Sequence, residues 1–107
     1  MMKNRIQREV LKLNPAIHYR HIAFVLRGGA IQSVGLNLTR HAEVAALLGL
    51  YPSDRYGTKV VSIRVRKDGS FAMAKPCKHC EKFMRLNGVK KVSWTDSNGV
   101  FQTERYR

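Results

Sequence analysis

Residues 21–37 read HIAFVLRGGAIQSVGLN, and this stretch predicts the first part of a β-sheet. Two runs rich in β-branched and other apolar residues are separated by Gly28 and Gly29, a pair that favours the tight turn of a β-hairpin. We therefore expect two antiparallel, neighbouring strands here. A hairpin alone is not stable in water, so the rest of the chain has to supply further strands and the helices that cover them.

Helical periodicity appears in three other parts of the chain. Apolar residues recur at helical spacing over residues 4–13, over 39–52, and from 77 to about 87. The second of these helices is expected to start close to His41, and Pro76 suits the first turn of the third. The chain is thus predicted to contain three helices, one before the hairpin and two after it.

Three more strands are predicted downstream of the hairpin. The run TKVVSIRVR (58–66) is rich in β-branched residues, and VKKVSWT (89–95) and VFQTERYR (100–107) are joined by the short turn DSNG (96–99). That turn makes the last two strands an antiparallel hairpin, whereas helix-linked crossovers favour parallel partners. We expect a single α/β domain over residues 1–107, with a mixed five-stranded sheet and helices on its faces.

Composition limits the classes of protein that need to be considered. Hydrophobic residues make up 44% of the 107-residue chain, which is typical of a globular domain. The longest apolar stretch, VAALLGL (44–50), is far shorter than the roughly 20 residues that cross a bilayer, and MMKNRIQREV has no signal-peptide pattern. We expect a cytoplasmic protein without a membrane partner, in whose reducing surroundings two cysteines bind metal or act in catalysis more often than they form a disulfide.

The chain is strongly basic. Twenty Lys and Arg residues against seven Asp and Glu residues give a formal net charge of +13. Such an excess favours encounter with polyanions, above all nucleic acid.

Two short motifs contain the residue types that catalysis needs. HAE (41–43) lies at the start of one predicted helix, and PCKHC (76–80) at the start of another. Cys77 and Cys80 are one turn apart, so both thiolates can reach one ion, and His41 can add a nitrogen ligand. Three protein ligands leave the fourth position of a tetrahedral Zn²⁺ open to water, which is the arrangement of a catalytic zinc.

Glu43 is expected to be the proton carrier of this site. It lies two residues after His41, on the same first helical turn, and it is one of only seven acids in the chain. Zinc lowers the pKa of a bound water toward about 7, and a neighbouring carboxylate can pass its proton to a substrate nitrogen. These are the requirements of hydrolytic deamination.

The two motifs resemble the signature of the zinc-dependent cytidine and deoxycytidylate deaminase superfamily, H-x-E followed by P-C-x-x-C. The resemblance extends to the predicted element order and covers residues 4 to 105. It implies a three-layer α/β/α fold and a zinc ion held by His41, Cys77 and Cys80, with Glu43 as the proton shuttle. It also implies substrate contacts at Asn37, Ala42 and Pro76.

The resemblance implies an enzyme of the hydrolase class that converts cytosine to uracil by attack of zinc-bound hydroxide on C4. The basic charge favours a nucleotide or a single-stranded nucleic acid as substrate. Two features leave the substrate class open. The terminal hairpin is similar to that of cytidine and blasticidin deaminases, whereas a histidine as first ligand is similar to the deoxycytidylate, tRNA-adenosine and APOBEC-type members.

Other interpretations of the same motifs also stay open. The chain could be a free cytidine or deoxycytidine deaminase, or a non-catalytic, basic nucleic-acid-binding module that retains the zinc fold. Cys77 and Cys80 could form a redox pair, and His79 could complete a structural zinc site, although it should point away from the ion. Cytidine deaminases of this size close their pockets at subunit interfaces, so a homo-oligomer is a further alternative.

Several residues have both an ordinary and a functional interpretation. Arg64 and Arg66 share one face of a predicted interior strand, where they either extend to the sheet edge or receive a phosphate. Lys75 precedes the cysteine motif and Lys78 lies within it, and both could contact phosphate or nucleic acid. His21 is interpreted as an ordinary packed or surface histidine.

Overall fold

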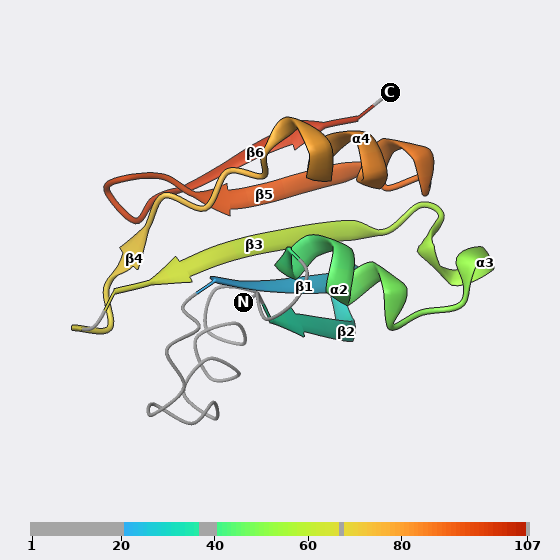
Figure 1. Ribbon diagram of the computed structural model, residues 1–107, viewed down its shortest axis with the longest axis horizontal. Helices are drawn as coiled ribbons and strands as arrows, with labels where there is room; N and C mark the ends of the chain where they lie inside the picture. The colour runs from blue at the N-terminus through green and yellow to red at the C-terminus, as the bar shows by residue number, and fades with distance from the viewer. Residues whose placement is uncertain (1–20, 37–40, 67, 107) are drawn as a thin grey trace.

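The computed structural model describes residues 21–36, 41–66 and 68–106 (Figure 1). It begins with the predicted hairpin: β1 (His21–Arg27) and β2 (Ala30–Leu36) pair antiparallel, with Arg27 opposite Ala30. Gly28 and Gly29 have φ values of 59° and 83°, and a two-residue turn with positive φ at both positions is the type that matches the twist of a hairpin. The helix predicted over residues 4–13 lies outside the described residues.

Five strands and one short addition form a mixed sheet. After β1 and β2 come β3 (Lys59–Val65), β5 (Lys91–Thr95) and β6 (Phe101–Arg105), in the spatial order β2-β1-β3-β5-β6. The β5–β6 pair is the predicted antiparallel hairpin, and it lies at one edge of the sheet. The two-residue strand β4 (Phe71–Ala72), which the sequence did not predict, pairs with the end of β3.

The directions of the strands agree with the predicted crossovers. The β3–β5 pair is parallel, as expected for strands that are joined through a helix. The crossover from β2 to β3 skips one position, because β1 lies between them and is antiparallel to both. Strands β2 and β3 therefore run in the same direction without being neighbours.

The described helices are α2 (Ala42–Leu48), α3 (Pro52–Arg55) and α4 (Lys78–Leu86). Helix α2 begins directly after His41 and α4 directly after Cys77, as predicted. The short helix α3 was not predicted, because its first residue, Pro52, is the last residue of the stretch over which a single helix was expected (39–52).

Helices α2 and α4 lie side by side on one face of the sheet, and α3 lies at one end of the molecule (Figure 1). Side chains of both helices and of the strand face beneath them form one core cluster, which includes Ala23, Val25, Ala46, Val60, Met84, Val92 and Trp94. A second cluster on the opposite strand face contains Ile22, Phe24, Leu26, Val61, Ile63 and Val65. Both faces of β1 and β3 are therefore buried, which explains their nearly continuous apolar sequence.

The two helices that pack along the sheet, α2 and α4, cover the same face; of the three predicted helices, only the one over residues 4–13 lies outside the described part of the chain. Within the described residues, no helix is long and apolar enough to cross a membrane.

Candidate metal centre

Close packing between α2 and β2 fixes the position of His41. Gly35 on β2 lies directly under α2, where an added Cβ atom would be 2.9 Å from the Ala46 Cα atom and still closer to the Ala42 carbonyl oxygen. The helix can approach the strand this closely only because Gly35 has no side chain. His41 is the N-cap residue of α2, with extended backbone angles, so its side chain lies at the very start of the helix.

The two cysteines lie at the start of α4. Cys77 is the N-cap residue, and the backbone N–H of Glu81 donates to its carbonyl oxygen over 2.9 Å, which closes the first helical turn. Cys80 lies within that turn and is buried, whereas Cys77 is exposed. Their sulfur atoms are 3.5 Å apart. The three-residue spacing thus brings both thiols to one point, as the sequence predicted.

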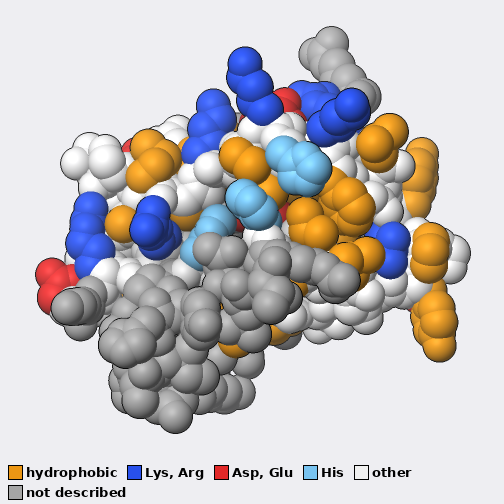
Figure 2. Space-filling model, viewed as in Figure 1, with side chains coloured by type: hydrophobic (Ala, Val, Ile, Leu, Met, Phe, Trp, Pro, Cys, Tyr) orange, Lys and Arg blue, Asp and Glu red, His pale blue; other side chains and the backbone are white. Residues whose placement is uncertain are grey.

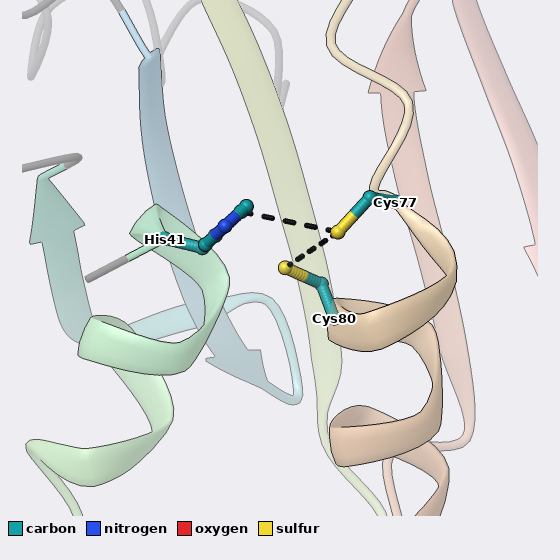
Figure 3. Close-up of side chains that lie close together, drawn as sticks. All are labelled: His41, Cys77 and Cys80. Carbon is teal, nitrogen blue, oxygen red and sulfur yellow. Dashed lines mark hydrogen bonds between the residues drawn. The ribbon is translucent and has the colours of Figure 1, made fainter.

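Donor atoms of His41, Cys77 and Cys80 all lie within 4.8 Å of one another (Figure 3). The Nδ1 atom of His41 is 3.9 Å from the Cys77 sulfur, and the histidine points from the start of α2 toward both cysteines at the start of α4. A tetrahedral zinc with ordinary bond lengths holds two sulfurs about 3.8 Å apart, and a sulfur and a nitrogen about 3.6 Å apart. The three residues therefore fit a metal ion such as zinc.

His79 does not belong to this group of donors, although it lies between the two cysteines in the sequence. Its side chain is exposed, and the centre of its ring is 6.4 Å from that of His41. This placement agrees with the expectation that His79 points away from the ion, and it removes the residue that the structural-zinc interpretation required.

The two thiols have opposite electrostatic surroundings. The backbone N–H groups of Cys80 and His79, at the start of α4, lower the pKa of the Cys77 thiol. Burial raises the pKa of the Cys80 thiol, and the negative charge of Glu43 raises it further. A metal ion bound to both sulfurs would favour the thiolate form of Cys80, because a thiol that coordinates a metal is deprotonated. It would thereby offset the effects of burial and of the Glu43 charge on the pKa of Cys80.

Glu43 is completely buried next to this group of donors. Its Oε1 atom lies 2.8 Å from the His21 Nε2 atom and accepts a hydrogen bond of 2.8 Å from the Ser62 hydroxyl. Burial raises the pKa of Glu43, but the hydrogen bond and charge of His21 and the hydrogen bond from Ser62 outweigh it, so the pKa lies below its usual value. A buried carboxylate is therefore kept ionised.

The other oxygen of this carboxylate is unusual. Among the described residues, Glu43 Oε2 is a buried side-chain atom without a hydrogen-bond partner. Buried polar atoms are nearly always satisfied, and an exception indicates a position for a water molecule, an ion or a reacting group. An unsatisfied carboxylate oxygen beside a His/Cys/Cys group is consistent with a metal site that also binds water or substrate.

Sequence reasoning missed His21 and Ser62. Both lie on the helix-covered face of the sheet, in positions diagonal to each other across the β1–β3 pair. Ser62 is a buried polar residue in the middle of the apolar run of β3, and that interruption was the available signal. The interpretation of His21 as an ordinary histidine was incomplete, because its ring contacts the buried carboxylate.

The remaining predicted site residues have varied surroundings. Asn37 lies outside the described residues, and Ala42 and Pro76 are buried at the starts of the two helices. Arg66 donates to the carbonyl oxygens of Phe71 and Ser97, over 2.6 and 3.0 Å, so its guanidinium connects two turns of the chain.

Basic side chains surround the site on the same face of the molecule. In Figure 2, Lys and Arg side chains gather over and around α4, next to the histidines in the middle of this face. Lys75, Lys78 and Arg64 are exposed, and the Lys75 Nζ atom is 5.3 Å from the ring centre of Trp94. Arg64 lies directly opposite His21 in the β1–β3 register.

No family model matches the chain, and no match is found among curated proteins or solved structures.

Proposed function

We propose that this protein is a zinc-dependent hydrolytic deaminase that converts cytosine to uracil in a nucleotide or a single-stranded nucleic acid. The observation that carries the proposal is the partnerless Oε2 atom of the buried Glu43, beside three metal donors from the starts of two helices. Neither a structural metal site nor a redox pair gives a reason to bury an ionised carboxylate at this position. The similarity of both motifs to the deaminase signature supports the same reaction.

The overall reaction adds water to cytosine and releases ammonia. A zinc ion held by His41, Cys77 and Cys80 would lower the pKa of a water molecule at its open position. Glu43 would accept one proton from that water through its free oxygen and pass it to N3 of the ring, while the remaining hydroxyl bonds to C4. It would then carry the proton of that hydroxyl to the amino group, so that the bond between C4 and the amino nitrogen breaks, ammonia leaves and the C4 carbonyl of uracil forms. The carboxylate is suited to these steps because it is ionised, buried and already fixed through its other oxygen.

Charge and exposure support a substrate that carries phosphate. The chain has a net charge of +13, and Lys75, Lys78 and Arg64 are exposed. Lys75 and Lys78 lie within two positions of Cys77, and Arg64 is the partner of His21 in the β1–β3 register. A neutral nucleoside gains little from such a surface, whereas a nucleotide or a single strand is attracted to it. Arg66 is not included in this proposal, because its donors already bind backbone carbonyl groups.

The test compares zinc-loaded wild type with two variants, Glu43→Gln and the matched control Glu81→Gln. Substrates are cytidine, deoxycytidine, CMP, dCMP and single-stranded DNA and RNA, and products are scored as ammonia and uracil. We expect Glu43→Gln to lose about 10²- to 10⁴-fold in rate, the usual contribution of general acid–base catalysis, while binding zinc normally. Glu81 lies on the α4 surface, paired with Arg85 over 3.0 Å, so its variant should keep wild-type activity.

The proposed mechanism is wrong if Glu43→Gln releases ammonia at the wild-type rate. If the zinc-loaded wild type binds nucleic acid but deaminates no cytosine compound, the non-catalytic binding module is the better description.

A further inference from the structure

A compact polar cluster lies beneath the metal donors, formed by Glu43, His21, Ser62 and the backbone carbonyl of Ala74. The Ser62 hydroxyl oxygen is 2.8 Å from Glu43 Oε1, 2.8 Å from the Ala74 carbonyl oxygen and 2.6 Å from His21 Nε2. His21 Nε2 is itself 2.8 Å from Glu43 Oε1. Four polar groups therefore share one small buried volume, and none of them belongs to the metal donors.

The number of protons available for hydrogen bonds gives His21 and Ser62 different roles. A carboxylate oxygen and a carbonyl oxygen can only accept hydrogen bonds, whereas the hydroxyl of Ser62 has a single proton to donate. That one proton is shared between Glu43 Oε1 and the Ala74 carbonyl oxygen, both of which lie 2.8 Å from the hydroxyl oxygen. A proton on His21 Nε2 gives Glu43 Oε1 a donor of its own, so that Oε1 does not depend on the shared hydroxyl proton alone. The contacts therefore assign the form of His21 that carries its proton on Nε2.

The cluster also limits how the carboxylate can turn. Glu43 is completely buried, and its contacts with His21 and Ser62 both involve Oε1. Oε2 is left without a partner, and the charge of the carboxylate is felt at the Cys80 thiol. Without a donor at His21, Oε1 would depend on a hydroxyl that also serves Ala74, and the carboxylate could rotate away from the orientation in which Oε2 is free.

We propose that His21 is a positioning residue, which holds Glu43 Oε1 through its Nε2–H group and so keeps Oε2 oriented for proton transfer. This inference rests on the proposed deaminase function. The side chain of His21 is 20% exposed, and its strand neighbour across the β1–β3 pair is the exposed Arg64. His21 therefore lies between the buried Glu43 carboxylate and the solvent.

Four variants test the role of His21 in the zinc-loaded protein. His21→Leu removes the donor, His21→Gln retains an N–H donor, Ser62→Ala removes the shared hydroxyl, and Ser93→Ala is a matched control. Ser93 is a buried serine on β5 whose hydroxyl bonds only to Thr103 among the described contacts.

For His21→Leu we expect a decrease in kcat of about 10- to 100-fold, with KM within about threefold of wild type and unchanged zinc content. His21→Gln should recover most of the lost kcat, and Ser62→Ala should fall between the two. A rise in KM without a change in kcat, or a glutamine variant as slow as the leucine variant, would contradict the proposed role.

A second measurement does not depend on activity. In the wild-type chain, nitrogen–proton correlation spectra of the histidine rings should show a proton on His21 Nε2, and its resonance should shift in Glu43→Gln. An unprotonated Nε2 overturns the inference even where the leucine variant fails to fold. If the wild type deaminates no cytosine compound, the proposed function fails, while the spectrum still decides whether the contact exists.

Discussion

Cys77, Cys80 and His41 lie at two helix starts, and we expect a metal ion bound there to need all three as ligands. Replacing Cys80 by Ser exchanges a thiolate for a weaker, uncharged donor at the one buried ligand. We expect the metal content of Cys80→Ser to fall from about one zinc per chain to near zero after dialysis. Elemental analysis of purified protein measures it, and His79→Ala, which lies outside the donor group, should retain the metal. Equal loss in both variants would mean that the ligand set is wrong.

At the residue scale, the sequence predicted that His41, Cys77 and Cys80 lie together, but it did not predict the residues that contact Glu43. Cys77 and Cys80 are three positions apart on one helix, so their proximity follows from helical geometry alone. His21 and Ser62 are 41 positions apart and meet because of the exact pairing of β1 with β3. Strand register depends on the packing of the whole sheet, and a shift of one strand by one residue would put His21 and Ser62 on opposite faces.

At the element scale, the contact of α2 with β2 determines where His41 and Glu43 lie. Gly35→Ala adds a Cβ atom that would overlap the backbone of α2 near Ala42 and Ala46. We expect a loss of about 1–3 kcal/mol in the free energy of unfolding, since overpacked backbone has to shift. Urea unfolding measures it, and the exposed neighbour Gln32→Ala serves as control. A Gly35→Ala protein as stable as wild type would mean that α2 lies farther from the strand.

The turn between β5 and β6 should make part of the stability depend on pH. Asp96 accepts hydrogen bonds from the backbone N–H groups of Val100 and Asn98 and from the side chain of Gln102. The Val100 hydrogen bond is the largest cause that lowers the pKa of Asp96 from its ordinary value of 3.8. Because the folded pKa is lower than the unfolded one, the stabilisation is complete above the unfolded pKa and is lost as the pH falls through the folded pKa.

We therefore expect Asp96→Asn to be less stable than wild type at about pH 6, and this difference to shrink toward about pH 2.5. Thermal unfolding at several pH values measures it. A difference that stays constant over this range would show that the Asp96 charge has no part in holding the turn.

Helix starts and turns could be predicted where the residues next to them in the sequence favour the same structure as the packing of the domain. The Gly28–Gly29 turn, the start of α2 and the start of α4 were all found from local sequence. β4 is only two residues long, too short for any periodicity, and it exists because it pairs with the end of β3. The short helix α3 has no buried residue, so it carries no hydrophobic pattern.

At the scale of the whole molecule, the charge of +13 predicts how the proposed deaminase activity should respond to salt. We expect kcat/KM for a deoxycytidine-containing single strand to fall steeply between about 50 and about 200 mM salt, because bound counterions are released on binding. The value for cytidine, which is neutral, should change little. Steady-state assays with both substrates measure this contrast, and a preference for cytidine without salt dependence would contradict the phosphate-bearing substrate.

The arrangement of the sheet was only partly predictable. The mixed sheet and the terminal hairpin follow from the turns and the crossover lengths, and both are confirmed. The insertion of β1 between β2 and β3 has no local signal, since both possible orders satisfy the same hairpin and crossover.

The single parallel ladder among the described strands joins two antiparallel units, β2-β1-β3 and β5-β6. The first residue pair of this ladder is Lys59 with Lys91. Burial lowers the pKa of the Lys59 ammonium group, and the positive charge of Lys91 lowers it further. His41 precedes the helix that packs on the first unit, and both cysteines lie in the chain segment that leads into the second. A metal ion bound there would thus also cross-link the two halves of the domain. Its loss would lower the stability of the fold as well as remove the proposed catalytic activity.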